Sequence, residues 1–239
     1  MANFAVTMSK KYRHLFFDLD RTLWDFDSSA RMAFDEIYLK FNLNKKGIEG
    51  VGDFIKTYTR HNEHLWSLYR EGKITKELLR SERFRLTLSE FKIDDDILAE
   101  SIGNEYIKIS PLRVALFPNV VEILGYVRQK YSIHLITNGF SEVQDVKLRS
   151  AGLGKFFHSI VTSEEAGFKK PDLRIFDYAF LKSGARAQES IMIGDDPEVD
   201  ILGAKRAGMD QVLFDPHGKY VQNGSTYYIR DLIELKEIV

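Results

Sequence analysis

The segment of residues 14–24 constrains the fold of this chain more than any other, and its sequence is HLFFDLDRTLW. Residues 15–17 form a short apolar run of the kind that makes a strand buried in a parallel sheet. Asp18 and Asp20 follow one residue apart, and a period of two places both carboxylates on the same side of an extended backbone. Two acids this close are costly unless a cation lies between them or one keeps its proton. We therefore predict a site at the carboxyl end of this strand, where open α/β sheets bind their ligands.

The composition is that of an ordinary globular protein. The chain has 239 residues, enough for one large domain or a medium one that carries an insertion. Hydrophobic residues make up 44% and charged residues 29%, which is typical of soluble proteins. The formal net charge of −1 gives no sign of a nucleic-acid polymer as partner. The absence of cysteine excludes disulfides and thiolate metal sites.

The sequence also predicts where the protein resides. Residues 1–11 are mixed in character and hold no apolar region long enough for a signal peptide. No apolar run approaches the length that spans a membrane. We therefore expect a cytoplasmic protein with no membrane partner.

Between residues 26 and 112 the pattern is helical, and no strand is evident. Ser28 or Ser29 is expected to cap a first helix, and apolar residues between 51 and 69 recur at spacings of three and four. Thr75 resembles the N-cap of a third helix, and a fourth is expected at about 94–109, before Pro111. We predict that residues 25–112 form an all-helical insert.

The rest of the chain alternates between strands and helices. Strands are expected at 132–136, 159–161, 190–193, 211–214 and 227–229, and helices at 120–130, 141–150, 173–182, 198–207 and 231–239. This alternation implies right-handed crossovers and a parallel sheet. The predicted fold class is α/β, with a Rossmann-like parallel sheet core built from residues 1–24 and 113–239 and interrupted by the helical insert after the first strand.

Several polar side chains stand at or beyond the carboxyl ends of these strands, namely Asp18, Asp20, Thr22, Thr137, Asn138, Lys170, Asp195 and Asp200. The carboxyl ends of parallel strands face one way, so these groups can converge. Carboxylates suit a hard cation such as Mg²⁺, whereas a lysine, a hydroxyl and a helix N-terminus suit a phosphate. One aspartate can attack phosphorus and form an aspartyl phosphate, and a second can protonate the departing oxygen.

Four segments resemble, in order, the four motifs of the haloacid dehalogenase-like (HAD) superfamily, and the resemblance covers essentially the whole chain. They are DLDRT at 18–22, ITNG at 136–139, KP at 170–171 and GDDPEVD at 194–200. The resemblance implies Asp18 as the nucleophile and Asp20 as the general acid and base. It implies Thr137 and the Asn138 amide as phosphate ligands, with Lys170 neutralising both the nucleophile and the phosphoryl group.

The same resemblance implies a Mg²⁺ site. The ion would be held by Asp18, by the backbone carbonyl of Asp20 and by Asp195. Asp200 would bind it through water or anchor Lys170. The dehalogenases of the superfamily lack an acid at the position of Asp20, so this residue favours phosphoryl transfer.

Arg21 departs from the family pattern, which often has glycine or another small residue there. An outward side chain would be harmless, whereas an inward one could touch the leaving group. The helical insert is similar to the C1-type cap of the superfamily, which closes over the site and supplies specificity.

A closer resemblance is to the noncanonical pyrimidine nucleoside 5′-monophosphatases. It is carried by ITNGF at 136–140, SEEAG at 163–167, IFDYA at 175–179 and DILGA at 200–204, and by the cap residues Asn62, Leu65, Trp66, Tyr69, Gly72, Ile74, Arg83 and Phe84. The implied activity is Mg²⁺-dependent hydrolysis of a small phosphorylated substrate, with a nucleoside monophosphate favoured. A sugar-phosphate phosphatase or phosphomutase of the same fold stays open, as does a catalytically idle domain kept for binding. The sequence does not indicate an oligomeric state.

Two groups of cap residues have open roles. Arg80, Arg83 and Arg85 are expected to form a charged helix face, from which one arginine could reach the substrate. Trp24, Trp66, Tyr58 and Tyr69 could stack on a nucleobase, although aromatic residues at helical spacing pack more often in a core.

Overall fold

The computed structural model describes residues 12–220 and 224–239, and its contacts divide the chain into two compact units. The core unit holds the described residues up to Leu23, Leu116–Ser141 and Gly152–Val239; the cap unit holds Trp24–Ala115 and Glu142–Ala151. The domain boundaries at 24/25 and 112/113 remain predictions. The expectation that residues 1–11 contain no signal peptide lies outside the described residues.

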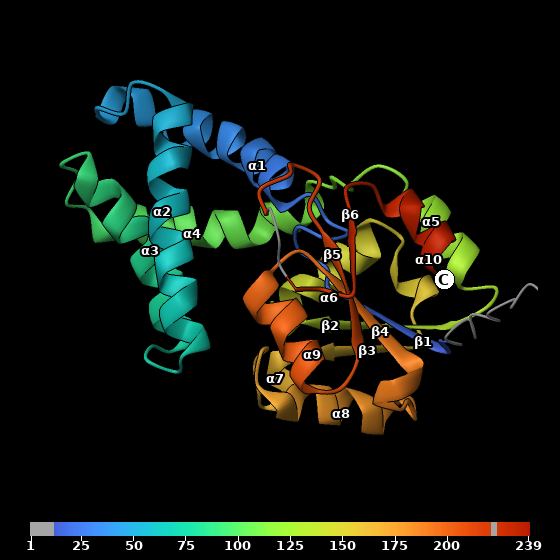
Figure 1. The fold of residues 1–239 in the computed structure, drawn as a ribbon. Helices are drawn as coiled ribbons and strands as arrows, with labels where there is room; N and C mark the ends of the chain where they lie inside the picture. Colours follow the sequence, from blue (N-terminus) through green and yellow to red (C-terminus); the bar gives the residue numbers. More distant parts are fainter. Residues whose placement is uncertain (1–11, 221–223) are drawn as a thin grey trace, which may run out of the picture. The chain divides into compact units, whose positions relative to one another are not determined.

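A six-stranded parallel sheet, in the order β3-β2-β1-β4-β5-β6, forms the centre of the core unit (Figure 1). Its strands are β1 His14–Phe17, β2 Ser132–Thr137, β3 Ser159–Thr162, β4 Ser190–Gly194, β5 Asp210–Phe214 and β6 Tyr227–Ile229. The first strand of the sequence thus lies between β2 and β4. The sheet confirms the predicted α/β class and all six predicted strands.

Complete burial explains why residues 15–17 of β1 are all apolar. Leu15, Phe16 and Phe17 are each 0% exposed, because β1 is paired on both edges and covered on both faces. The pairing continues one residue further, where the Asp18 N–H donates to the carbonyl of Ile193 at 2.9 Å. Asp18 is therefore held at the carboxyl edge of the sheet by the same hydrogen-bond ladder as the strand.

Helices cover both faces of this sheet, with α5 and α10 on one side and α7, α8 and α9 on the other (Figure 1). They are α5 Val120–Val127, α7 Ser163–Ala166, α8 Leu173–Ser183, α9 Gly203–Arg206 and α10 Leu235–Ile238. Short 3₁₀ turns lie at Gly154–Phe156, Ala187–Glu189 and Leu232–Glu234. Helix α6, Ser141–Ser150, has the predicted bounds and belongs mostly to the cap unit.

Three predicted helices differ from the structure. The helix expected at 198–207 is a π-helical turn, Pro197–Leu202, followed by α9. The turn forms because Asp196 accepts hydrogen bonds from several backbone N–H groups that follow it. Its carboxylate accepts from Glu198 N and Val199 N, and its carbonyl accepts from Ile201 N, five residues on. The helix expected at 231–239 is a 3₁₀ turn followed by α10, and the helix expected at 120–130 ends at Val127.

The cap unit is helical, as the sequence predicted, and residues 26–112 contain no strand. Its helices are α1 Phe26–Lys40, α2 Val51–Arg70, α3 Lys76–Glu90 and α4 Asp96–Ile109, with 3₁₀ turns at Leu43–Lys46 and Ser110–Leu112. Thr75 caps α3 as predicted. The N-cap of α1 is Asp25 instead of Ser28 or Ser29, because the Asp25 carboxylate accepts from Ser28 N at 3.0 Å.

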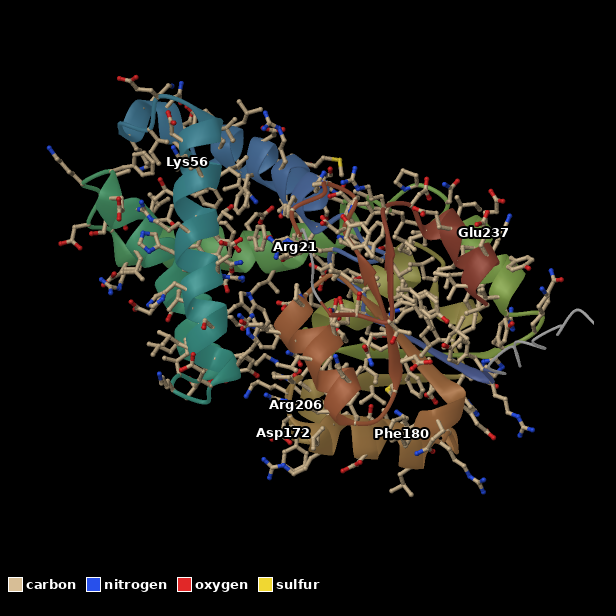
Figure 2. The ribbon with its side chains drawn as sticks, in the orientation of Figure 1. Arg21, Lys56, Asp172, Phe180, Arg206 and Glu237 are labelled. Atoms are coloured by element: carbon tan, nitrogen blue, oxygen red, sulfur yellow. The ribbon has the colours of Figure 1, made fainter. Side chains whose placement is uncertain are left out.

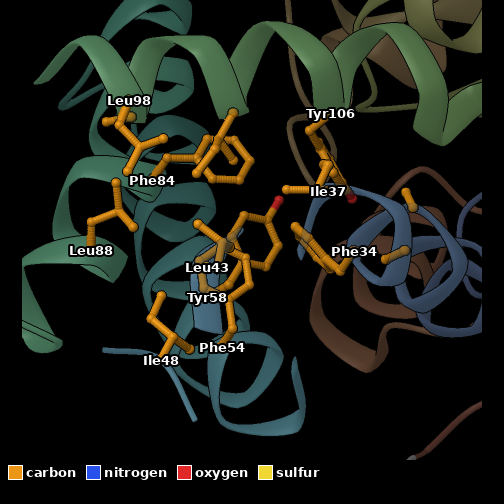
Figure 3. Packing of buried hydrophobic residues seen from close by; sticks show 14 of the residues in the cluster. Phe34, Ile37, Leu43, Ile48, Phe54, Tyr58, Phe84, Leu88, Leu98 and Tyr106 are labelled. Atoms are coloured by element: carbon orange, nitrogen blue, oxygen red, sulfur yellow. The ribbon is translucent and has the colours of Figure 1, made fainter. Parts of the chain in front are cut away.

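The cap unit has a hydrophobic core of its own, in which aromatic rings pack together (Figure 3). Phe34 stacks on Tyr106 with ring centroids 4.8 Å apart, and Tyr58 stacks on Phe84 at 5.1 Å. Tyr58 is 1% exposed and therefore belongs to this core. No helix in the described part of the chain is long and apolar enough to cross a bilayer.

Candidate active site

The carboxyl ends of β1, β2 and β4 bring together most of the polar residues singled out in the sequence. Asp18 directly follows β1, Thr137 ends β2 and Asp195 directly follows β4. Asp200 lies in the π-helical turn after β4, and Lys170 lies in the loop between α7 and α8. All five belong to the core unit.

Lys170 is the buried cation at the centre of this group. Its Nζ lies 2.6 Å from Asp18 Oδ1 and 2.6 Å from Asp200 Oδ1. The side chains of Lys170 and Asp200 are 1% and 2% exposed, and that of Asp18 is 10% exposed. Charges buried this deeply need partners, and the ammonium here supplies one partner for two carboxylates.

The backbone of Lys170 is fixed by the side chain of Asn138. Asn138 Nδ2 donates to the Lys170 carbonyl at 3.0 Å, and the Lys170 N–H donates to Asn138 Oδ1 at 2.8 Å. Ser163 Oγ in turn donates to the Asn138 carbonyl at 3.2 Å. The side chain of Asn138 is thus engaged in holding Lys170, a role that the sequence did not predict. Ser163 begins the SEEAG segment at 163–167, whose resemblance to the nucleotidases is the signal that could have suggested its contact with Asn138.

Thr137 is the last residue of β2 and borders the turn that follows it. It is 1% exposed, and its Oγ1 accepts from the Gly139 N–H at 3.1 Å. The hydroxyl therefore shapes the turn whose backbone N–H groups are the predicted phosphate donors.

Three carboxylates stand close enough to hold one cation. Asp18, Asp195 and Asp200 each offer an oxygen, and these oxygens lie within 4.8 Å of one another. Thr22 Oγ1 donates to Asp195 Oδ1 at 3.4 Å, and the Asp196 N–H donates to Asp200 Oδ2 at 3.2 Å. Oxygen donors of this kind are those that Mg²⁺ prefers in proteins.

Gly194 permits the close approach of Asp200. A Cβ at position 194 would lie 2.4–2.5 Å from side-chain atoms of Asp200, inside van der Waals contact. Only glycine therefore allows Asp200 to reach Lys170 from this turn. Asp196 caps the turn, because its carboxylate accepts from the N–H groups of Glu198 and Val199.

Electrostatics show that one lysine does not satisfy this cluster. Burial, followed by the negative charges of Asp200 and Asp20, raises the pKa of Asp18 to about 7, although Lys170 opposes the shift. Burial and the charges of Asp200 and Asp18 raise the pKa of Asp195 well above its usual range. The pKa of Asp200 is also raised, mainly by burial. The charges of Asp18 and Asp200 outweigh burial and raise the pKa of Lys170. An additional cation would fit this excess of negative charge.

Asp20 and Arg21 lie on the edge of this cluster. Asp20 is half-buried, and its charge contributes to the raised pKa of Asp18. Arg21, labelled in Figure 2, is half-buried and has a φ of 67°, in the left-handed region that favours glycine. Its charge opposes the rise in the pKa of Asp195 that burial and the neighbouring acids cause, so it acts on the acidic cluster. The positive φ of Arg21 gives a conformational reason for the glycine that the family pattern often has at this position.

Comparisons with known proteins agree with this geometry. The family model for haloacid dehalogenase-like hydrolases matches residues 12–208. The pyrimidine 5′-nucleotidase YjjG of Escherichia coli is 32% identical over 233 residues, which cover 96% of this chain and 98% of that protein. The glyceraldehyde 3-phosphate phosphatase of Methanothermobacter thermautotrophicus is 31% identical over 236 residues, which cover 94% of this chain and 98% of that protein.

A solved structure resembles this one along nearly its whole length. The crystal structure of the HAD-hydrolase YfnB from Bacillus subtilis, bound to magnesium, matches with a TM-score of 0.86 and 31% sequence identity. The match covers 96% of this chain and 99% of that one. The predicted combination of a Rossmann-like core with a helical insert is thus a known fold.

Proposed function

The chain belongs to the haloacid dehalogenase-like hydrolases and is a phosphatase of that family, and we propose that it hydrolyses nucleoside 5′-monophosphates through an aspartyl phosphate, with Mg²⁺ as cofactor. The observation that carries this proposal is the buried cluster in which Lys170 faces Asp18 and Asp200 at 2.6 Å. The Asp18 carboxylate lies against the buried ammonium of Lys170 and beside the acids Asp195 and Asp200. This arrangement suits attack by Asp18 on a phosphoryl group whose negative charge Lys170 and a metal ion would neutralise.

The proposed reaction has two steps. An oxygen of Asp18 attacks phosphorus, the bond from phosphorus to the ester oxygen breaks, and Asp20 gives that oxygen a proton. Asp20 then takes a proton from a water molecule, whose oxygen attacks the aspartyl phosphate and releases inorganic phosphate and Asp18. Lys170 and the backbone N–H groups after β2 stabilise the negative charge on the phosphoryl oxygens in both steps.

Asp18, Asp195, the carbonyl of Asp20 and, directly or through water, Asp200 are the groups that would hold Mg²⁺. When bound, the ion would neutralise the acids and polarise the phosphoryl oxygens. The excess of buried negative charge that raises the pKa of Asp18 and Asp195 supports this assignment. The magnesium in the YfnB structure supports it independently.

Similarity to YjjG, a pyrimidine 5′-nucleotidase, supports the choice of a nucleotide as substrate. The second candidate is a phosphorylated sugar or triose, favoured by the 31% identity to the glyceraldehyde 3-phosphate phosphatase over 94% of this chain. A phosphomutase would require a bisphosphate activator and release little phosphate. An idle binding domain would release none.

A substrate panel tests these alternatives. The protein is incubated with Mg²⁺ and pyrimidine and purine nucleoside monophosphates, glyceraldehyde 3-phosphate, sugar phosphates or an aryl phosphate, and released phosphate is measured. We expect the highest kcat/KM for a pyrimidine nucleotide. A higher value for glyceraldehyde 3-phosphate would favour the second candidate.

Variants identify the catalytic groups. Asp18→Asn should abolish turnover without unfolding the protein, and wild-type turnover in it would exclude Asp18 as the nucleophile. Asp20→Asn should lose most activity toward alkyl phosphates, whose leaving groups need a proton, and less toward aryl phosphates. An equal loss for both would contradict its role as the acid. Glu237→Gln, an acid on α10 (labelled in Figure 2), is the matched control.

A further inference from the structure

A cavity of about 640 Å³ opens at the amino ends of β1 and β2, and all the residues that line it belong to the core unit. The candidate active site stands at the carboxyl ends of the same two parallel strands, so the cavity lies at the opposite edge of the sheet. Figure 1 marks the C end of the chain on this side of the core unit, near the amino end of β1. A hollow of this volume is in the range that holds small organic ligands.

Basic side chains line this cavity from two separate segments of the chain. Arg13 directly precedes β1, whereas Arg128 and Lys130 follow α5. Among the described residues no aspartate or glutamate lines it, and Val239, with its terminal carboxylate, is the one lining residue that brings a negative charge. The whole chain has a formal net charge of −1, so this excess of positive charge is a local feature. Such a hollow attracts anions.

Hydrogen bonds of the sheet fix the backbone of the cavity wall. The Ser132 N–H donates to the carbonyl of Arg13 at 2.9 Å, and the His158 N–H donates to the carbonyl of Ile133 at 2.7 Å. The Nδ1 of His158 accepts from the Ile133 N–H at 3.1 Å. The proton of this neutral imidazole is therefore on Nε2, so His158 brings a further hydrogen-bond donor to the cavity.

The cations of the cavity are not neutralised by close ion pairs. The guanidinium of Arg128 has neither an ion pair nor a hydrogen bond with any residue that the structure describes. Arg13 Nε lies 3.8 Å from Glu189 Oε2, beyond hydrogen-bond distance, and its side chain is 63% exposed. Lys130 Nζ donates to the neutral phenol of Tyr126 at 2.7 Å. All three cations therefore keep their charge available to an anion.

The dipole of α5 explains only part of this arrangement. Basic residues are favoured near the C-terminal end of a helix, and this applies to Arg128 and Lys130. It does not apply to Arg13, which reaches the cavity from the start of a strand, or to His158. Compensation of a helix dipole also requires no hollow between the cations, whereas binding of an anion does.

We propose that this cavity is a second ligand site, which binds a small anion with several negative charges, of the class of polyphosphates and nucleoside polyphosphates. The guanidinium groups of Arg13 and Arg128 can each form two parallel hydrogen bonds to phosphate oxygens, and Lys130 adds a point charge. A single phosphate ion would fill only a small part of the cavity, so its volume favours a longer ligand that also contacts the half-buried Tyr131. The inference goes beyond the proposed function and does not depend on it.

Isothermal titration calorimetry of adenosine 5′-triphosphate (ATP) and of tripolyphosphate into the full chain tests the site without turnover. EDTA is present, because the acids of the candidate active site then have no metal ion to offset them and disfavour an anion. We expect one ligand per chain and a Kd that rises with the concentration of sodium chloride. Tighter binding of ATP would assign part of the affinity to the nucleoside, and equal or weaker binding would assign it to the phosphate chain. Binding of neither probe would overturn the proposal, whatever the phosphatase assays show.

Variants of Arg128 locate the binding. This residue is exposed, so Arg128→Gln and Arg128→Glu should fold as the wild type does. We expect the affinity for both probes to fall about ten- to a hundredfold in Arg128→Gln, which is the loss of hydrogen bonds to a charged group, and further in Arg128→Glu.

Arg31→Gln and Arg31→Glu are the matched controls, because Arg31 is an exposed arginine on α1 of the cap unit, outside the cavity. We expect both to keep the wild-type Kd. Equal losses in the Arg31 and Arg128 variants would show a general attraction between charges and would overturn the site. An unchanged Kd in the Arg128 variants would place the binding elsewhere and overturn it as well.

Discussion

Lys170 Nζ lies 2.6 Å from Asp18 Oδ1, although 152 positions separate the two residues in the sequence. The same ammonium lies 2.6 Å from Asp200 Oδ1, so one buried cation faces two buried carboxylates. Removing one member of such a group leaves charge without compensation, which costs about 3–5 kcal/mol. The stability of the core unit and the chemistry of the site therefore depend on the same side chain.

Lys170→Met keeps an unbranched side chain of similar length and removes its charge. At pH 8 and without Mg²⁺, we expect the free energy of unfolding to fall by about 3–5 kcal/mol in urea denaturation. Without the lysine the folded acids bind protons more tightly than the unfolded ones, so part of the stability should return as the pH falls toward 5. Lys182→Met, which removes a half-exposed partner of Glu165, is the control and should cost less than about 1 kcal/mol. A Lys170→Met protein as stable as the wild type at pH 8 would contradict the argument.

The affinity for Mg²⁺ should depend on pH. Burial raises the pKa of Asp18 to about 7 and also raises that of Asp195, so protons compete with the metal. Below pH 7 we expect the apparent Kd to rise about tenfold per pH unit for each proton displaced. Titration calorimetry at pH 6 and pH 8, in buffers of different ionisation enthalpy, measures both the Kd and the protons released. Equal Kd values at the two pH values would show that the acids are already ionised.

Gly194→Ala should disturb the site through one methyl group. The new Cβ would lie 2.4–2.5 Å from side-chain atoms of Asp200, so Asp200 must move away from Lys170. We expect a loss of about 1–3 kcal/mol in the free energy of unfolding, together with reduced phosphatase activity. Gly125→Ala in α5, where a Cβ meets nothing within 4 Å, is the control and should be neutral or stabilising. Similar effects at both positions would argue against a steric cause.

His134 should make the fold sensitive to acid. Burial, with smaller effects from the charges of His14 and His158, lowers the pKa of His134 to about 3, whereas the unfolded residue titrates near 6.5. Between these values the unfolded chain binds more protons, so stability is lost as the pH falls, by at most about 1.4 kcal/mol per unit. His134→Gln should flatten the slope of unfolding free energy against pH between 6.5 and 3. His217→Gln, an exposed control, should leave the slope as it is; a wild-type slope in His134→Gln would contradict the prediction.

The sequence predicted the strands well because a buried parallel strand leaves a strong local signal. Residues 15–17 are an apolar run that ends in acids, and that pattern marks both the strand and the edge where ligands bind. The order of the strands in space is not a local property, so the pattern did not show that β1 lies between β2 and β4. The N-cap of α1 was not predicted correctly from the sequence. Asp25, Ser28 and Ser29 are all residue types that favour the N-cap position, and only the backbone geometry selects Asp25.

The site was predictable in its acids and its lysine, and less so in what surrounds them. Asp18, Lys170 and Asp200 occur in recognisable motifs, and the structure brings them together. The reciprocal hydrogen bonds of Asn138 with Lys170 join residues 32 positions apart and have no local signature. Arginine is rarely buried, so composition and spacing placed Arg83 on the surface; only the packing of the aromatic rings around it shows otherwise.

The central place of β1 in the sheet has a consequence for the growing polypeptide. This strand leaves the ribosome before the other five strands of the sheet, yet it pairs with Ser132–Thr137 on one edge and with Ser190–Gly194 on the other. A nascent chain that stops before β4 therefore leaves one flank of its most apolar strand open to other chains. Such a truncated product also lacks Asp195 and Asp200, so premature termination should yield an aggregation-prone, inactive fragment instead of an enzyme of reduced activity.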